Sequence, residues 1–447
     1  MNIRTSKRAA FLLSLLLLTG CGTQISIDTA ESSETADTTV SSAITETTSQ
    51  TVSLTQTEAE TETVTVMTNT TASAAQSGST GTRQTRVTQQ TRSTGTAKQT
   101  ETAVTTVTET AKLPTENFYE TIAAMTVEQK AAQMILCTCS DAGTAMKAVK
   151  AGVGGLCLFA KPFSGKTKEQ VRAMNADFQK NALLPLIISV DEEGGSVNRI
   201  SLNPQLRAVP FWSGKALYAE GGWDLVTSDT KEKADLLLDL GVNVNLAPVC
   251  DVPLSSSNYI YNRCFSLDAE ETAEYIRVVV TEMKADGLGA TLKHFPGYGG
   301  SVDTHKNMSY DDRDYEAFSE GDFKPFEAGI KAGAGSVMVS HNIVNCMDSE
   351  YPASLSPAVH RILRDTLNFS GVIITDDLGM DAIKQFTNGQ NPVVTAVLAG
   401  NDLICYSDYA GSISAIVSAV SDGTIREEQL DEAVMRVLKW KRALGII

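Results

Sequence analysis

The sequence predicts an α/β protein, a (β/α)8 TIM barrel preceded by a disordered Thr-rich tether. From Pro114 onward, short apolar runs alternate with longer amphipathic segments, which is typical of parallel strands joined by helices. Polar residues follow most of these runs, where the carboxyl ends of barrel strands would lie. Residues 22–113 contain no aromatic residue and no proline, and are mostly Thr, Ser, Glu, Ala and Gln.

Residues 1–21 have the pattern of an export signal. Basic residues precede an apolar run, residues 9–18, that is too short to span a bilayer as a permanent helix. The run ends in Leu-Thr-Gly-Cys, which resembles the cleavage site of a bacterial lipoprotein with Cys21 as the lipidated residue. An ordinary secretory signal with an incidental cysteine is the alternative. We expect the protein at the extracytoplasmic face of the cell membrane, attached through a lipid anchor only.

Residues 22–113 cannot bury enough apolar surface to offset the entropy of ordering, so we expect a disordered tether. This composition is also found in O-glycosylated stalks. Residues 114–447 are then the folded domain. The formal charge of −16 argues against a nucleic-acid partner. No metal or organic cofactor is implied, and the oligomeric state is left open.

Each predicted element follows from the local pattern. Thr126 is expected to cap a first helix with an acidic residue in its first turn. The expected strands are 134–138, 155–159, 186–190, 242–247, 290–293, 336–339, 372–375 and 402–406. The expected helices include 168–181, 269–285, 315–332, 355–367 and 426–443. An open doubly wound sheet is the alternative, but no Gly-x-Gly-x-x-Gly fingerprint follows an early strand.

The loop after the fifth strand, Lys293 to His305, reads Lys-His-Phe-Pro-Gly-Tyr-Gly-Gly-Ser-Val-Asp-Thr-His and holds two of the four histidines. Polar groups also follow other strands, at 191–193, 251, 262–263, 340–342, 376–377 and 407–408. In a parallel barrel these positions share one end, where active sites are built. A set of charged donors and acceptors with few large apolar walls is suited to a hydroxyl-rich ligand such as a sugar.

A retaining glycosidase needs a carboxylate nucleophile on a rigid element and a second group that donates and accepts a proton. Asp376, at the end of a β-branched strand, is a candidate nucleophile, and Asp377 is its nearest rival because adjacent residues point opposite ways. His305 is a candidate acid/base because an imidazole titrates near neutral pH. Asp303 is close enough in sequence to fix its tautomer.

Six motifs resemble glycoside hydrolase family 3, and within it the single-domain β-N-acetylglucosaminidases. They are Asp191-Glu-Glu-Gly-Gly-Ser-Val-Asn-Arg199, Asn245-Leu-Ala-Pro-Val-Cys-Asp251, Lys293-His-Phe-Pro-Gly297, Asp303-Thr-His305, Pro352-Ala-Ser-Leu-Ser356 and Thr375-Asp-Asp-Leu-Gly-Met380. The resemblance implies that Asp376 is the nucleophile and that His305, paired with Asp303, is the acid/base. It also implies that the hydroxyls of the sugar are held by Asp191, Arg263, Lys293 and His294.

The chain departs from the family pattern at three positions. Tyr298 stands where the loop usually has His, Thr304 stands where Ser usually separates the Asp and the His, and Ser196 is often Arg. Tyr298 is expected to change a pocket-side group near the leaving-group site. None of the departures removes a proposed catalytic residue.

The resemblance implies hydrolysis of a terminal β-linked N-acetylglucosamine, for which peptidoglycan fragments are a natural source at a cell surface. A β-glucosidase or another exo-glycosidase of the family is the first alternative, but many of those carry a second α/β domain that supplies the acid, and none follows the last strand here. A β-N-acetylglucosaminide phosphorylase is the second alternative. A non-catalytic surface sugar binder is the least favoured, because the full catalytic set is present.

Overall fold

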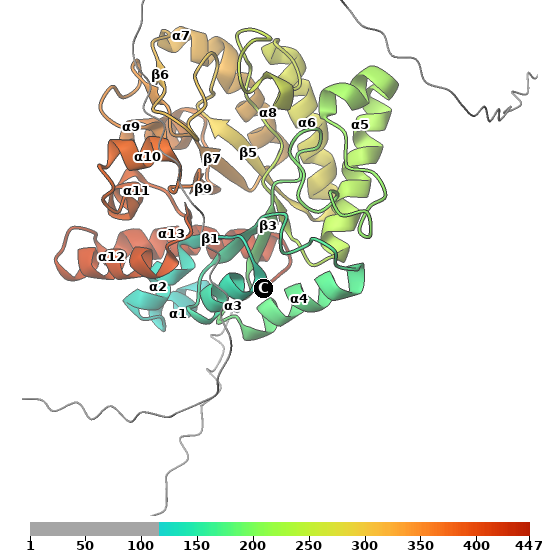
Figure 1. The fold of residues 1–447 in the computed structure, drawn as a ribbon. Coiled ribbons are helices and arrows are strands. Elements are labelled where there is room, and N and C mark those ends of the chain that lie inside the picture. The colour runs from blue at the N-terminus through green and yellow to red at the C-terminus, as the bar shows by residue number, and fades with distance from the viewer. Residues whose placement is uncertain (1–115) are drawn as a thin grey trace, which may run out of the picture. The chain divides into compact units, whose positions relative to one another are not determined.

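The computed structural model describes residues 116–447 (Figure 1). Eight parallel strands lie in the order β10-β1-β2-β3-β4-β5-β7-β9, and a bridge between Ile374 and Leu403 joins β9 to β10. This closure confirms the predicted barrel. The predicted signal, residues 1–21, and the predicted tether, residues 22–113, lie outside the described residues, as do residues 114 and 115 of the predicted domain.

The barrel strands fall close to the predicted runs. They are β1 (Ile135–Cys139), β2 (Gly155–Leu158), β3 (Ile187–Val190), β4 (Val244–Asn245), β5 (Gly289–Phe295), β7 (Ser336–Val339), β9 (Val372–Thr375) and β10 (Ile404–Cys405). β4 and β10 are shorter than predicted because side chains replace backbone partners beside them. Asn243 Oδ1 accepts from the Ile188 N–H, and Thr375 Oγ1 accepts from the Cys405 N–H.

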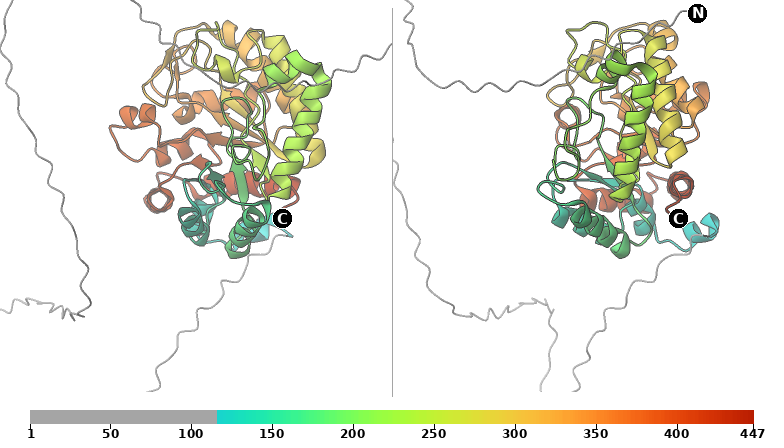
Figure 2. Two further views of the ribbon diagram at one scale, coloured as in Figure 1. Left: turned by 45° about the vertical axis from the view of Figure 1, so that its right-hand side comes forward. Right: turned by 90° about the vertical axis from the view of Figure 1, so that its right-hand side faces the viewer.

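Helices connect the strands and surround the barrel (Figures 1 and 2). They are α1 (Phe118–Ala123), α2 (Val127–Gln133), α3 (Ala142–Lys150), α4 (Lys168–Asn181), α5 (Gly214–Asp239), α6 (Ala269–Asp286), α7 (Tyr315–Ala317), α8 (Phe323–Ala332), α9 (Pro357–Arg361), α10 (Asp381–Phe386), α11 (Val393–Ala399), α12 (Tyr409–Ser421) and α13 (Glu427–Ala443). The predicted cap at Thr126 is confirmed, since its hydroxyl accepts from the Gln129 N–H and the Gln129 side chain accepts from the Thr126 N–H. No helix within residues 116–447 is long and apolar enough to cross a bilayer.

Two predicted helices are less regular than their patterns indicated. The segment 315–332 contains a π-helical turn, Phe318–Asp322, ahead of α8. Pro325 has no N–H to donate to the carbonyl four residues earlier, so regular bonding is lost at this point. The segment 355–367 begins its helix at Pro357, because Ser356 caps it, and it ends in a second π-helical turn, Ile362–Thr366.

The elements outside the predicted ranges include α5 and a small second sheet. α5 has a Gly-Gly break, and Gly222 has φ of 64°, so no single amphipathic stripe runs along it. A two-stranded parallel sheet pairs β6 (Tyr310–Asp311) with β8 (Ile343–Val344). This pair joins the loop after β5 to the loop after β7, beside the end of the barrel where polar residues gather.

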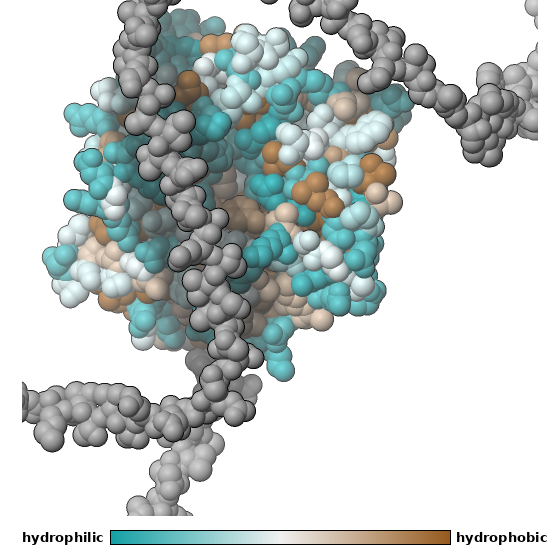
Figure 3. All heavy atoms as spheres, viewed as in Figure 1, coloured by the Kyte–Doolittle hydropathy of each residue, from teal (hydrophilic) through white to brown (hydrophobic). Residues whose placement is uncertain are grey.

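The core has two main parts. One lies between the strands and the surrounding helices. The other fills the barrel and includes Leu136, Ile187, Val244, Leu246, Met338, Val372, Ile374, Leu403, Cys157 and Cys405. Val437 and Trp440 of α13 join this inner cluster, and Trp440 packs against Gly335 at the start of β7. α13 therefore closes the amino end of the barrel. On the surface seen in Figure 3, apolar residues are interspersed with hydrophilic ones.

Candidate active site

A cavity of about 340 Å³ opens at the carboxyl ends of the barrel strands. Most of the predicted site residues line it, namely Asp191, Arg263, Lys293, His294, His305 and Asp376. The wall is completed by Thr138, Cys157, Phe159, Glu193, Val197, Arg199, Leu246, Met338, Asp377, Met380 and Cys405. The structure thus brings together predicted site residues that are up to 185 positions apart in the chain (Asp191 to Asp376). The predicted lipidation site, Cys21, lies outside the described residues.

Lys293 and Arg263 are joined by a buried carboxylate that the sequence did not single out. Lys293 Nζ lies 2.8 Å from Asp191 Oδ1 and 2.7 Å from Glu193 Oε1. Arg263 makes a bidentate contact with the same Glu193, with Nη2 at 2.7 Å and Nε at 3.0 Å from the two carboxylate oxygens. Glu193 therefore fixes both cations on one wall of the cavity.

The charges of this network stabilise one another. Burial alone would raise the pKa of Glu193, but Arg263 and Lys293 hold it well below its ordinary value. Burial would lower the pKa of Lys293, yet Asp191 and Glu193 raise it. Arg263 likewise keeps a raised pKa against burial because Glu193 lies beside it. All three groups are therefore ionised at neutral pH.

His294 follows Lys293 directly, and both side chains line the cavity. Strand pairing shifts register between Lys293 and Phe295, and such a bulge re-aims neighbouring side chains. His294 Nδ1 lies 2.7 Å from Asp251 Oδ2, so the ring donates from Nδ1 to this fully buried carboxylate. Nε2 then accepts from Arg263 Nη2 at 3.2 Å. Asp251 therefore sets the orientation of His294.

Asp376 leaves the end of β9 with its backbone N–H bonded to the Val339 carbonyl. Burial opposes its charge, but His341, His294 and the Asp377 N–H lower its pKa, so it is ionised at neutral pH. Asp377 differs, because burial raises its pKa to about 6. The two adjacent carboxylates are thus distinguished by their surroundings, and Asp376 has the properties required of a nucleophile.

His341, one of the polar residues that follow β7, is not part of the cavity wall. It is fully buried, Nε2 donates to the Asp377 carbonyl at 3.0 Å, and Nδ1 accepts from the Ser354 hydroxyl at 2.8 Å. Burial lowers its pKa. It therefore supports the Asp376–Asp377 turn as a neutral ring.

His305 and Asp303 lie on the loop after β5, at the mouth of the cavity. His305 Nδ1 donates to Asp303 Oδ1 at 2.8 Å, and the His305 side chain is 60% exposed. Partial burial works against the Asp303 charge, but the hydrogen bonds from His305 lower its pKa. With Nδ1 committed to Asp303, Nε2 is the nitrogen available for proton transfer.

Two further residues of the first motif act around Asp191. Arg199 lines the cavity, with Nη2 3.5 Å from Asp191 Oδ2. Glu192 is fully buried and accepts from the backbone of Arg199, Ile200 and Ser201. Glu192 holds the loop that carries Arg199, whereas its neighbours Asp191 and Glu193 line the cavity.

Tyr298 does not have the expected place at the leaving-group site. It is 1% exposed and is not part of the cavity wall. The tryptophans also stay away from this cavity, as expected: Trp440 is buried, Trp223 packs on Phe265, and Trp212 is 49% exposed.

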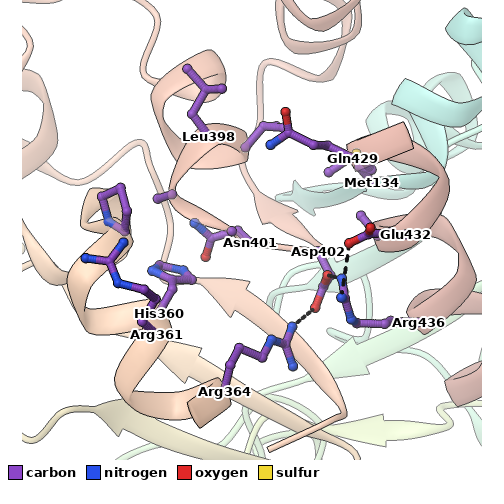
Figure 4. Close-up of a pocket in the computed structure, with 15 residues that line it drawn as sticks. Met134, His360, Arg361, Arg364, Leu398, Asn401, Asp402, Gln429, Glu432 and Arg436 are labelled. Carbon is purple, nitrogen blue, oxygen red and sulfur yellow. Dashed lines mark hydrogen bonds and ion pairs between the residues drawn. The ribbon is translucent and has the colours of Figure 1, made fainter. Parts of the chain in front are cut away.

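A second cavity, of about 310 Å³, lies beside the amino ends of β1 and β10 (Figure 4). In it, Asp402 pairs with Arg364 at 2.6 Å and with Arg436 at 3.0 Å. His360, in α9, also lines this cavity; it is 3% exposed, and its Nδ1 donates to the Ser356 carbonyl. These pairs join the π-helical turn after α9 to β10 and α13.

Six of the seven cysteines after Cys21 are buried and unpaired, as small hydrophobic residues would be, and Cys346 is exposed. Within residues 116–447 no group of three His, Cys, Asp or Glu side chains is arranged to hold a metal ion. The expectation of no cofactor stays a prediction.

A parallel barrel with an ionised carboxylate, a His–Asp pair and a wall of paired charges is consistent with a glycoside hydrolase. The profile of the glycosyl hydrolase family 3 N-terminal domain matches residues 126–440. The chain therefore belongs to glycoside hydrolase family 3, and it is a glycoside hydrolase.

Relatives agree with this assignment. A "Beta-hexosaminidase" from Xanthomonas campestris is 35% identical over 271 residues, which are 59% of this chain and 81% of the relative. One from Xylella fastidiosa is 34% identical over 282 residues, covering 60% and 82%. A family 3 β-N-acetylglucosaminidase from a Paenibacillus species has a TM-score of 0.68 at 30% identity. That alignment covers 72% of this chain but only 63% of the Paenibacillus protein.

Proposed function

We propose that this protein is a retaining exo-glycosidase that removes terminal β-linked N-acetylglucosamine. One observation carries the proposal: Asp376, which follows β9, and His305, on the loop after β5, line the same cavity as the paired charges of Asp191, Glu193, Arg263 and Lys293. A carboxylate and a proton-transfer group on either side of one sugar are the requirements of double displacement.

In the first step, an Asp376 oxygen attacks the anomeric carbon while the bond from that carbon to the leaving-group oxygen breaks. His305, as the imidazolium, gives its Nε2 proton to the departing oxygen. The products are a glycosyl ester on Asp376, a free alcohol and a neutral imidazole. Asp303 stabilises the imidazolium before transfer and keeps Nδ1 protonated after it.

In the second step, neutral His305 takes a proton from water as the water oxygen attacks the anomeric carbon. The ester bond to Asp376 breaks, which restores the carboxylate and releases the sugar with its original anomeric configuration. Two inversions at one carbon give net retention.

Asp191, Arg263, Lys293 and His294 are proposed to hold the hydroxyls of the sugar. Asp191 and Glu193 keep Lys293 charged, and Asp251 orients His294, so these donors are fixed before the sugar binds. A larger hollow, of about 620 Å³, shares Arg199 with the catalytic cavity and offers space for the leaving group. The "Beta-hexosaminidase" names of the relatives support an N-acetylated hexosamine as substrate.

The test is cleavage of p-nitrophenyl β-N-acetylglucosaminide beside the β-glucoside by the full chain, with and without phosphate. We expect preferential cleavage of the acetamido sugar, independent of phosphate. Asp376→Asn should abolish turnover, whereas the matched Asp377→Asn should retain measurable activity. Preference for the glucoside would indicate another exo-glycosidase, and a requirement for phosphate would indicate a phosphorylase. No turnover under any condition would favour a sugar-binding role.

We also propose that the enzyme acts on peptidoglycan fragments from the extracytoplasmic face of the cell membrane, held by a lipid on Cys21. The basic and apolar residues before Cys21 support this proposal. Cys21→Ala should move the protein from the membrane fraction to the soluble fraction and prevent labelling by a fatty-acid probe. Membrane association unchanged by Cys21→Ala would contradict it.

A further inference from the structure

Two of the departures from the family pattern contact each other. Tyr298 and Thr304 are six positions apart on the loop after β5. The Tyr298 hydroxyl lies 2.7 Å from Thr304 Oγ1, and both residues are buried, at 1% and 0% exposure. Thr304 separates Asp303 from His305. The buried hydrogen bond therefore holds the residue between the two members of the His–Asp pair.

Tyr298 is itself firmly anchored. Its backbone N–H donates to Asp251 Oδ1 at 2.8 Å, and the other oxygen of Asp251 orients His294. The Tyr298 ring packs edge-on against His294 and Tyr259, with centroid distances of 5.1 and 5.4 Å. Burial and the nearby Asp376 charge raise the pKa of Tyr298, so its hydroxyl keeps its proton. Tyr298 is therefore a rigid point of attachment behind the cavity wall, next to His294.

The His305–Asp303 pair, called the dyad below, is by contrast partly exposed and has few contacts with the rest of the protein. His305 is 60% exposed, and its partner Asp303 is 27% exposed. The Thr304 carbonyl accepts from the Ala382 N–H at 3.3 Å, and the Val302 N–H donates to Ser309 Oγ at 3.0 Å. Among the described residues these contacts, with the Tyr298 bond, fix the loop on either side of an otherwise exposed catalytic histidine.

We propose that Tyr298 is a positioning residue for the acid/base step, acting through Thr304 to hold the Asp303–His305 dyad over the cavity. This inference rests on the proposed function, in which His305 protonates the leaving group. Removal of the Tyr298–Thr304 hydrogen bond leaves the nucleophile and the sugar-binding charges in place. It lowers the fraction of molecules in which His305 can reach the glycosidic oxygen.

The measurement that separates positioning from general destabilisation is leaving-group dependence. A p-nitrophenolate leaves without a proton, whereas the sugar alcohol released from N,N′-diacetylchitobiose requires one. Tyr298→Phe should lower kcat/KM for the disaccharide about 3- to 10-fold, which is the effect of one net hydrogen bond. The value for the p-nitrophenyl glycoside should change less than about 2-fold, because its leaving group departs without a proton from His305.

Two variants at the other end of the bond provide the matched pair. Thr304→Val removes the hydroxyl at constant shape and should reproduce the selectivity of Tyr298→Phe. Thr304→Ser keeps the hydroxyl and should behave like wild type. The double variant Tyr298→Phe/Thr304→Val should be no worse than either single variant, because both remove the same bond. Thermal melting of each variant checks that it is folded.

His305→Gln distinguishes failure of this inference from failure of the proposed function. If His305→Gln gives strong leaving-group selectivity and Tyr298→Phe gives none, the positioning role is refuted and the dyad stands. If His305→Gln gives no selectivity, or wild type cleaves neither substrate, the proposed mechanism fails and the positioning role fails with it. Equal losses for both substrates in Tyr298→Phe, or a Thr304→Ser variant as impaired as Thr304→Val, would also overturn the inference.

Discussion

Replacement of Glu193 by Gln tests whether one carboxylate organises the sugar-binding wall. Glu193 is 5% exposed and accepts from both Lys293 and Arg263. Gln keeps the shape but removes the charge, which leaves two buried cations with Asp191 alone close to Lys293. Breaking a buried ion pair by removing one partner typically costs about 3–5 kcal/mol. For a folded unit of about 330 residues the unfolding entropy is roughly 0.7 kcal/mol per kelvin, so Tm should fall by about 4–7 °C.

The assay is thermal unfolding of wild type and Glu193→Gln at pH 7 and at pH 4 or below. The folded pKa of Glu193 is lowered by its partners, so its contribution is complete above the ordinary carboxyl pKa and is lost as pH falls toward the folded value. The difference between the proteins should therefore shrink in acid. Glu327→Gln removes an exposed i,i+4 pair with Lys331 and should cost at most about 1 kcal/mol. Equal Tm and equal kcat/KM for Glu193→Gln and wild type at pH 7 would refute the reasoning.

Three other changes are expected to have measurable effects. Burial lowers the pKa of Lys441 to about 7. Between pH 7 and about 10 the unfolded chain therefore binds more protons than the folded protein. The free energy of unfolding should rise by about 2 kcal/mol from pH 7 to 9. The Lys441→Met variant should not show this rise, whereas Lys439→Met, which replaces an exposed lysine nearby, should show it. A rise in both variants would contradict the lowered pKa of Lys441. Asp251→Asn removes the acceptor that orients His294 and should lower kcat/KM about 10- to 100-fold without unfolding the protein, as steady-state kinetics and thermal melting would show. In Arg263→Lys the lysine cannot make the bidentate contact with Glu193, so KM for the sugar should rise. Wild-type kinetics in this variant would argue against a role of Arg263 in binding.

The barrel was predictable because its strands are buried on both sides. Runs such as 336–339 and 372–375 are mostly apolar, are buried throughout and have the same bounds in the structure. Parallel strands buried on both faces produce continuous apolar runs, which sequence reasoning detects easily. The predicted range of β4 was too long, because at its start the Ile188 N–H bonds to the Asn243 side chain and not to the backbone of that residue. A side chain that takes the place of a backbone group in the hydrogen bonding between strands cannot be recognised from the pattern of apolar residues.

The residues that line the site were predictable, but the contacts that set their state were less so. Asp376 and Asp377 look alike in sequence, and only the surrounding histidines and hydrogen bonds separate their pKa values. Asp251 was noted after strand four, yet its role as the partner of His294 depends on a fold that brings strands β4 and β5 side by side.

One contact does have a signal in the sequence. In an extended segment, residues two positions apart face the same way and the residue between them faces the opposite way. Asp191 and Glu193 both reach Lys293, while Glu192 turns inward to the backbone of residues 199–201. Alternation applied to the Asp-Glu-Glu run would have assigned Glu193, and not Glu192, to the sugar site. The Tyr298–Thr304 contact has no such signal, because it depends on how a glycine-rich loop closes back on itself.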